Sequence, residues 1–311
     1  MEKVNKNQLS PSVLKNSQFT IKDFNCWVCG SNKLEIAKSS NIESSVEKKY
    51  SLVNSDYGIT GELHRCKNCG FVQWSMIDDN EVISLYEPLE DTSFDSICKA
   101  RVIQQIKILK RIKKYRLSGK LLDVGAANGL FVSEAIKMGY HAEGLEPSEW
   151  FYRKAVEKNL PFHHGTLPHP NAAGPYDVIT LIDVLEHVQN PVALLSKIHK
   201  IIAKDGILVV VVPDIESFPA KLLKWKWWNY KPGHIGYFNK KNLELAMKNA
   251  GFYLLNQGFR PSVNYPLDFI LERINLYFPK KIRLPVPKIL KGIIISLDLK
   301  DEIMGFYSPV Q

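Results

Sequence analysis

Four of the five cysteines stand in two closely spaced pairs that can bind a metal ion. Two residues separate Cys26 from Cys29 and Cys66 from Cys69, and a glycine follows each pair. Each pair can present two thiolates from one tight turn, and four thiolates suit a tetrahedral zinc ion with no open position for catalysis. We therefore predict structural zinc (Zn2+), with an iron–sulfur cluster or free thiols as the alternatives. The fifth cysteine, Cys98, is predicted to be an ordinary buried residue.

A glycine turn between a predicted strand and a predicted helix indicates a nucleoside site. The stretch Leu121–Gly129 reads LLDVGAANG, so Gly125 closes an apolar run. Small residues let a ligand approach the backbone, and the helix N-terminus offers N–H groups. A dinucleotide motif would have glycine where Ala127 and Leu130 stand, so a nicotinamide cofactor is disfavoured.

Glu146 supports the same interpretation because it follows Gly125 by 21 residues, at the end of the next predicted strand. A carboxylate at that place can accept hydrogen bonds from both hydroxyls of a ribose. The alternative is a turn glycine and a surface glutamate in an unrelated α/β domain.

Strands and helices alternate from residue 119 onward, and this alternation must position the two motifs. It predicts a parallel α/β sheet with helices on both faces, whose ligands bind beyond the carboxyl ends of the strands. The predicted strands are Lys120–Val124, His141–Leu145, Tyr176–Ile182, Ile207–Val212 and Phe252–Gly258. The predicted helices are Leu130–Met138, Glu149–Lys158, Asn190–Ala203 and Asn239–Ala250.

Three stretches resemble the class I S-adenosylmethionine-dependent methyltransferases: Asp123–Gly129, Glu146–Ser148 and Tyr176–Val188. The resemblance implies an enzyme with a Rossmann-like doubly wound methyltransferase sheet, helices on both faces, and S-adenosyl-L-methionine as cofactor. A small zinc-ribbon module would precede this domain, as in one subfamily to which His234–Phe238 is similar. The resemblance implies that the cofactor is bound by Asp123, Gly125, Ala126, Gly129, Glu146, Pro147, Asp183 and Val184.

Methyl transfer to an oxygen or carbon atom often needs a base near the methyl group, just past the fourth strand. Glu186 and His187 stand there, and an unperturbed histidine has a suitable pKa. His234 is a second catalytic candidate, in a loop that follows a cluster of aromatic residues and could cover the cleft. For both histidines the alternative is a purely packing role.

The net charge of +9 is concentrated in one stretch, because nine Lys or Arg and no acid lie in Lys99–Lys120. Apolar residues at helical spacing predict an amphipathic helix there. Its basic face is either solvated or meets an anionic partner. The predicted buried face consists of Val102, Ile103, Ile106, Leu109 and Ile112.

No apolar run reaches the roughly 18 residues of a membrane-spanning helix, and the first ten residues have no apolar signal core. We therefore expect a cytoplasmic protein without a membrane span. Apolar residues near the C-terminus are predicted to pack against the core, with peripheral membrane contact as the alternative. These residues are Ile289, Leu290, Ile293, Ile294 and Leu297.

Five parts make up the predicted domain organisation. Residues 1–22 form a flexible tail, residues 23–75 the zinc ribbon, and residues 76–118 a connector with a short helix at Glu81–Tyr86 and the basic helix. An alternating segment, Tyr50–Leu63, predicts a β-ribbon between the cysteine pairs. Residues 119–260 form the S-adenosylmethionine-binding methyltransferase domain, and residues 261–311 an extension that completes the sheet.

The predicted function is methyl transfer, by in-line displacement, to a small or carrier-linked metabolite, which we expect to be anionic. Sugars, cell-envelope precursors and quinone-like molecules are the candidate acceptors, because the zinc-ribbon arrangement resembles sugar C-methyltransferases and the stretch Asp183–Val188 resembles O-methyltransferases of quinone biosynthesis. A ribosomal RNA base methyltransferase is the first alternative, since the basic helix would suit a phosphate backbone. A non-catalytic cofactor-binding protein is the second.

Overall fold

The computed structural model describes residues 25–42, 57–75, 98–275, 277–278, 282–283, 285, 287–290 and 292–311. The predicted tail and the predicted helix at Glu81–Tyr86 lie outside the described residues. So does most of the predicted ribbon Tyr50–Leu63; its described part forms no strand before Leu63.

A seven-stranded sheet forms the centre of the chain, in the order β10-β13-β8-β7-β4-β5-β6. Five adjacent strands run parallel to one another, in the order β8-β7-β4-β5-β6. In contrast, β13 is antiparallel to both of its neighbours, β8 and β10. The predicted all-parallel sheet is therefore wrong for β13, which enters between β8 and β10 from the opposite end. The strands are β4 Gly119–Val124, β5 Tyr140–Glu146, β6 Phe162–His164, β7 Tyr176–Ile182, β8 Ile202–Pro213, β10 Phe252–Phe259 and β13 Glu302–Pro309.

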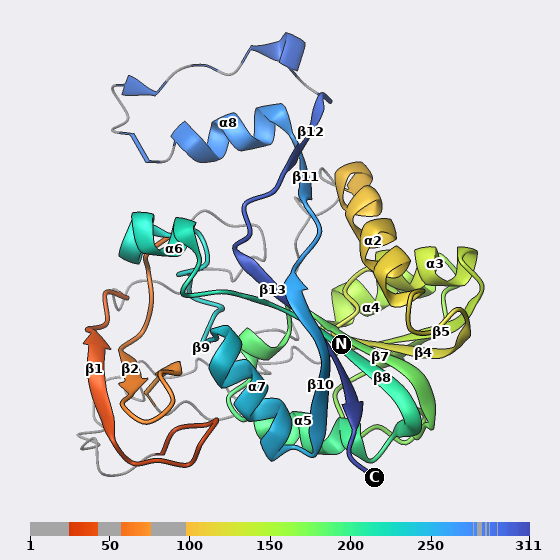
Figure 1. Ribbon diagram of the computed structural model, residues 1–311. Helices are drawn as coiled ribbons and strands as arrows, with labels where there is room; N and C mark the ends of the chain where they lie inside the picture. The colour runs from red at the N-terminus through yellow and green to blue at the C-terminus, as the bar shows by residue number, and fades with distance from the viewer. Residues whose placement is uncertain are drawn as a thin grey trace, which may run out of the picture.

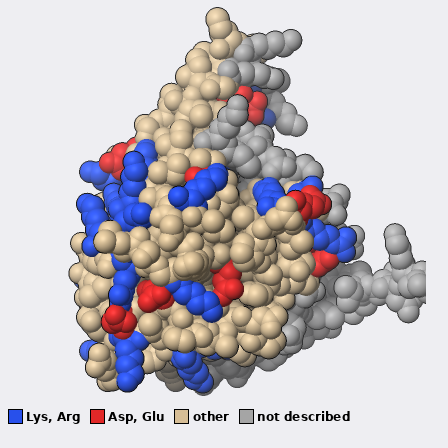
Figure 2. Space-filling model, turned by 90° about the vertical axis from the view of Figure 1, so that its right-hand side faces the viewer, with Lys and Arg blue, Asp and Glu red and all other residues tan. Residues whose placement is uncertain are grey.

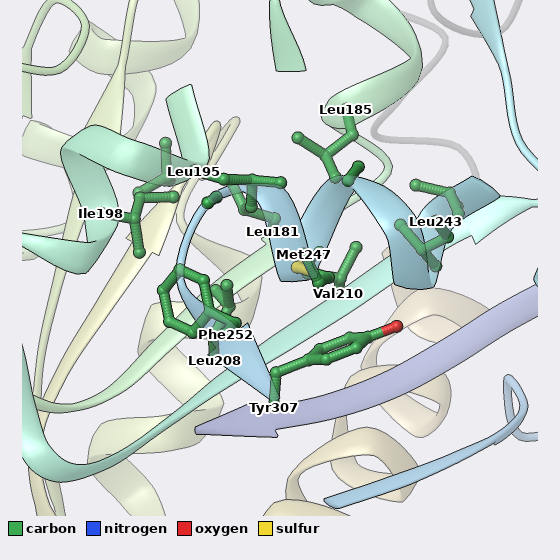
Figure 3. Packing of buried hydrophobic residues seen from close by; sticks show 14 of the residues in the cluster. Leu181, Leu185, Leu195, Ile198, Leu208, Val210, Leu243, Met247, Phe252 and Tyr307 are labelled. Carbon is green, nitrogen blue, oxygen red and sulfur yellow. The ribbon is translucent and has the colours of Figure 1, made fainter. Parts of the chain in front are cut away.

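Helices cover both faces of this sheet (Figure 1). Since side chains alternate along a strand, Leu208 and Val210 of β8 pack on one face and Val209 and Val211 on the other. Figure 3 shows the first face, where β7, β8, β10 and β13 meet two helices, α5 and α7. The opposite face packs against α2 and α3. The helices are α2 Cys98–Ile112, α3 Leu130–Lys137, α4 Glu149–Val156, α5 Pro191–His199, α6 Phe218–Leu223, α7 Lys240–Asn249 and α8 Leu267–Asn275.

Side-chain caps begin four of these helices, and Ser217 is the cap of α6. The side chains of Ser148, Asn190 and Asn239 accept hydrogen bonds from backbone N–H groups of α4, α5 and α7. The helix predicted to reach Ala203 ends four residues earlier, because β8 already pairs with β7 at Ile202. β8 therefore begins five residues before the predicted strand Ile207–Val212.

The buried face of the basic helix agrees with the prediction in part, because Leu109 and Ile112 are buried as predicted and Val102 and Ile106 are half-buried. Ile108, Leu109 and Ile112 are buried, but Ile103 is 40% exposed. Gln104 and Gln105 are buried as well, and both line a cavity described below.

A small antiparallel sheet carries the cysteines, in the order β1-β2-β3-β9. Its first three strands are β1 Leu34–Lys38, β2 Leu63–Cys66 and β3 Val72–Trp74. The fourth strand, β9 Gly236–Tyr237, lies in the sequence between β8 and β10 of the large sheet. Cys26, Val28 and Phe71 belong to the same apolar cluster as α5 and α7, so the ribbon and the large sheet share one core.

A C-terminal arm, made of β11 (Val263–Pro266), α8 and β12 (Ile294–Leu297), projects at the top of Figure 1. The prediction that its apolar residues pack against the core is wrong for Ile289, which is 84% exposed, and for Ile293, which is 45% exposed. Among the helices that the structure describes, none is both long and apolar enough to cross a membrane.

Candidate active site and metal centre

A cavity of about 440 Å³ lies beyond the carboxyl ends of β4 and β7. Its walls come from the β4–α3 turn, the loop after β7, the loop before β9, α2 and the C-terminal arm. This is the place where parallel α/β sheets bind their ligands.

The cavity brings together most of the predicted site residues. The three predicted catalytic residues, Glu186, His187 and His234, all line it. Four of the predicted cofactor-binding residues line it too: Asp123, Gly125, Ala126 and Asp183. Gly129, Glu146, Pro147 and Val184 are not among the lining residues; Glu146 and Val184 contact the β4–α3 turn, and Gly129 ends that turn.

The β4–α3 turn has a backbone that only a few residue types adopt easily. Gly125 has φ +74°, and a Cβ atom there would lie 2.7 Å from a methyl carbon of Val184. Gly129, with φ +78°, caps α3 in the left-handed region. Ala127 also has a positive φ, 45°, so it tolerates a conformation that favours glycine.

Two buried carboxylates stand under this turn. Glu146 accepts hydrogen bonds from the backbone N–H groups of Ala127 and Ser148, both at 2.8 Å. Asp123 accepts one from the hydroxyl of Thr180 at 2.6 Å. Burial raises the pKa of each carboxyl to about 7. Hydrogen bonds from ligand hydroxyls or a nearby positive charge would stabilise the ionised form of such buried carboxylates. The two carboxylates therefore fit a nucleoside cofactor with a sulfonium group.

The catalytic candidates form a compact cluster on the cavity wall. Glu186, His187 and His234 each offer a ligand atom, and these atoms lie within 4.8 Å of one another. The rings of the two histidines meet edge to face at 4.7 Å. Nδ1 of His187 lies 2.6 Å from the carbonyl oxygen of Gly233, so Nδ1 carries the proton and Nε2 is the basic nitrogen.

Burial sets the charge of this cluster. Glu186 is 1% exposed, and neither carboxylate oxygen has a hydrogen-bond partner among the described residues. Burial and the nearby Asp183 raise the pKa of Glu186 well above its ordinary value. Burial lowers the pKa of His187 to about 4, and that of His234 well below its usual range. A group of this composition can bind a metal ion or move a proton.

Sequence reasoning missed a buried arginine behind the loop after β7. Arg260 follows β10 and binds both carboxylate oxygens of Asp183 at 3.0 Å and Glu302 at 2.5 Å. With its amide turned to accept, Gln104 receives two further bonds from Arg260, each of 2.8 Å. Asp183 has φ +58°, and this network holds it there. No motif marks Arg260, because its partners come from three distant segments.

The four cysteines of the two pairs form one cluster, as predicted from their spacing. Sγ of Cys26 lies 3.5 Å from that of Cys69, and Sγ of Cys29 lies 3.5 Å from that of Cys66. All four sulfurs are within 4.8 Å of one another. A tetrahedral ion with Zn–S bonds of about 2.3 Å needs sulfur separations of roughly 3.8 Å, so the donor set and its size fit zinc.

The basic helix uses several of its charges within the chain. Lys107 donates to the Ser262 hydroxyl at 2.8 Å and reaches the C-terminal arm, and Arg111 donates to the carbonyl of Phe259. Arg116 binds Asp205. Figure 2 looks onto the side of the molecule where α2 and α3 lie, and it shows Lys and Arg interspersed with Asp, Glu and uncharged surface. The charged run in the sequence therefore does not become one continuous basic surface.

Comparisons with known proteins agree with this geometry. A family profile described as Methyltransferase domain matches residues 99–257. Similar curated proteins include the ubiquinone biosynthesis O-methyltransferase of Haemophilus ducreyi, 26% identical over 42% of this chain and 62% of its own length. The enzyme of the same name from Pelagibacter ubique is 24% identical over 55% of this chain and 82% of its own. This chain thus spans less than two thirds of the Haemophilus enzyme.

Solved structures with a similar fold are distant in sequence. Magnesium protoporphyrin IX methyltransferase from Synechocystis PCC 6803 has a TM-score of 0.49 and 14% identity, covering 75% of this chain and 100% of that one. A possible histamine N-methyltransferase from Thermotoga maritima has a TM-score of 0.45 and 19% identity, covering 68% and 90%. The family profile covers more than half of the chain, on the segment that builds the cavity. The chain belongs to the class I S-adenosylmethionine-dependent methyltransferases.

Proposed function

We propose that this enzyme transfers a methyl group to an oxygen atom of a small or carrier-linked acceptor, with His187 as the base. The observation that carries the proposal is the cluster of Glu186, His187 and His234 on the wall of the cavity that also holds the β4–α3 turn. Ubiquinone biosynthesis O-methyltransferases among the relatives support oxygen as the acceptor atom.

The cofactor would lie against the β4–α3 turn, with Glu146 toward its ribose and Asp123, Gly125 and Ala126 toward its methionine end. When bound, S-adenosyl-L-methionine supplies a methyl group on a positively charged sulfur. The chain's own task is to orient the acceptor and to remove its proton, and orientation alone can contribute on the order of 7–11 kcal/mol.

His187 suits the proton-transfer role because the carbonyl of Gly233 fixes its ring and leaves Nε2 basic. Glu186, once ionised, stabilises the positive charge that His187 gains. His234 is only 3% exposed, so it supports the ring of His187 rather than meeting the acceptor.

Aromatic side chains in the outer part of the cavity support an acceptor with a ring or an apolar part. Phe131, Trp228 and Tyr265 line it, together with the cations Arg101 and Lys231. Stacking on aromatic rings and a nearby positive charge suit a sugar, a quinone-like ring or a cell-envelope precursor that carries an anionic group.

Labelled cofactor tests the proposal directly. The protein is incubated with methyl-tritiated S-adenosyl-L-methionine and fractionated bacterial metabolites, and transfer of label to an organic-soluble or anionic small molecule is expected. Cofactor binding without any labelled product would instead favour the non-catalytic alternative.

Replacing Glu146 by alanine is expected to weaken cofactor binding by about 1–3 kcal/mol, the cost of losing hydrogen bonds to a charged group. Because burial raises the pKa of Glu146 to about 7, the ionised acceptor becomes scarce as the pH falls below 7. Affinity should therefore drop toward acid pH in the wild type. Calorimetric titration measures both effects.

Glu157→Ala is the matched control for this experiment, since Glu157 is exposed on the end of α4. It should leave the affinity unchanged. A Glu146→Ala variant that binds S-adenosyl-L-homocysteine like the wild type would contradict the ribose role.

A charge-reversal variant separates a small acceptor from RNA. Lys110, Lys113 and Lys114 are changed to Glu together, while Arg111 is kept because it holds the carbonyl of Phe259. An enzyme that neutralised many RNA phosphates would lose affinity steeply with salt, whereas a small acceptor engages one or two cations. We expect unchanged methyl transfer and a shallow salt dependence; loss of both RNA crosslinking and activity would show that the acceptor is RNA.

We also propose that zinc is the metal of the four-cysteine cluster. Its support is the number and softness of the ligands and their tetrahedral spacing. A closed thiolate site gives the ion a structural role.

A further inference from the structure

The last strand of the cysteine-bearing sheet is also the end of a cavity loop. β9 pairs with β3 through Val72–Tyr237 and Gln73–Gly236. The N–H of Trp74 donates to the carbonyl of Ile235 at 2.8 Å. The residue before Ile235 is His234, which lines the cavity.

The same loop is bonded on its other side to the catalytic candidates. The N–H of Ile235 donates to the carbonyl of Glu186 at 2.8 Å. His187 bonds to Gly233 at 2.6 Å, and the hydroxyl of Tyr237 donates to the carbonyl of His234 at 2.8 Å. Residues 233–237 are therefore held between β3 and the turn that carries Glu186 and His187.

One buried side chain joins β3 to the first cysteine pair. Gln73 is fully buried, and its amide oxygen accepts from the N–H of Trp27 at 2.9 Å. Its amide nitrogen donates to the carbonyl of Asn25 at 3.1 Å. Gln73 thus binds the backbone on both sides of Cys26 while its own backbone pairs with Gly236.

Apolar packing strengthens this connection. Phe71 is fully buried, and its ring lies 4.8 Å from that of Phe238 and 6.4 Å from that of Trp27. Gly236 leaves room for Phe71, because a Cβ atom there would lie 3.0 Å from the ring. Phe71 therefore packs both against Trp27 of the first cysteine pair and against the loop.

We propose that the four-cysteine ribbon positions the catalytic candidates, and that Gln73 is a positioning residue through which the turn of Cys26 and Cys29 fixes His234 and His187. The proposal rests on the proposed function for the meaning of those histidines. A ribbon that only stabilised the chain would need no polar connection to a cavity loop, and this one has a continuous path through Gln73, Gly236 and Ile235.

The test follows the histidine rings rather than methyl transfer. The full chain is labelled with 13C at the histidine rings, and the signals of His187 and His234 are assigned by substitution. Gln73→Leu is compared with Asn249→Ala, a control that removes another hydrogen bond to the ribbon, 2.8 Å from Asn249 to the carbonyl of Val28, far from the loop. Zinc content and affinity for S-adenosyl-L-homocysteine are measured for each variant.

We expect Gln73→Leu to keep one zinc and the wild-type affinity, yet to shift both ring signals and to speed amide exchange in residues 231–238 by about tenfold or more. Asn249→Ala should change neither. Identical ring signals in the two zinc-containing variants would overturn the proposal.

If Gln73→Leu cannot hold zinc, Gly236→Ala tests the same proposal, because this variant keeps every cysteine and Gln73. Its added methyl group meets Phe71 and should shift the same two signals; unchanged signals would overturn the proposal as well. Because no readout requires catalysis, shifted signals in a chain that transfers no methyl group would contradict the proposed function and still support this inference.

Discussion

Replacing His187 by alanine is expected to lower kcat for methyl transfer by about 10²–10⁴-fold, the usual contribution of a positioned general base. Cofactor affinity should stay within a few-fold of the wild type, because the β4–α3 turn and Glu146 are untouched. Single-turnover assays with labelled cofactor measure the first effect and calorimetry the second.

The control for this variant is His141→Ala, at an exposed position of β5. It should have wild-type activity. If His187→Ala retains kcat within threefold of the wild type, the base is another group, and His234 is the next to test.

The pH profile gives an independent check on the same cluster. Burial lowers the pKa of His187 to about 4, so His187 stays neutral and basic at every pH above that value. Burial and Asp183 raise the pKa of Glu186 above its ordinary 4.5, so Glu186 loses its charge as the pH falls through the raised value. The rate should therefore rise with pH along a limb that lies above pH 4.5. Glu186→Gln should be slower and should lack this limb.

Cys66→Ser is expected to remove the zinc that we predict at one ion per chain. Structural zinc contributes about 10–16 kcal/mol of apparent binding energy in small zinc domains, and that energy stabilises the fold around it. Cys66 is 1% exposed and belongs to the core shared with α5 and α7, so the loss should lower the Tm by on the order of 10 °C. Metal analysis and thermal unfolding measure the two effects.

Cys98→Ser is the matched control, because Cys98 is not one of the four clustered cysteines. It should keep full zinc. Cofactor affinity in Cys66→Ser should be retained even when the ribbon loses order, since the hydrogen bonds described for the Glu146 carboxylate come from Ala127 and Ser148 and not from the ribbon. A coloured protein that contains iron would contradict the zinc assignment.

Local chemistry explains what could be predicted from the sequence. The glycine turn, Glu146 and the segment from Asp183 to His187 each occupy a strand end, and strand ends of a parallel sheet meet at one edge. The cluster of four cysteines could be predicted from the spacing within the two pairs alone, since thiolates from two tight turns can converge on one ion. Helix caps at Ser148 and Asn190 are equally local, because a cap bonds to backbone within three residues.

Only the tertiary structure decided how these parts fit together. The reversed direction of β13, the buried face of α2 and the partners of Arg260 depend on segments far apart in the chain, and no periodicity encodes which of them will meet. Gln104 has a polar side chain of the kind usually found at the surface, yet it is buried against Arg260, which comes from a distant segment. The sequence by itself therefore predicted the methyltransferase fold, the cluster of four cysteines and the strand ends that meet at the cavity. The packing of distant segments decided that the ribbon, through β9, reaches the histidines of the cavity.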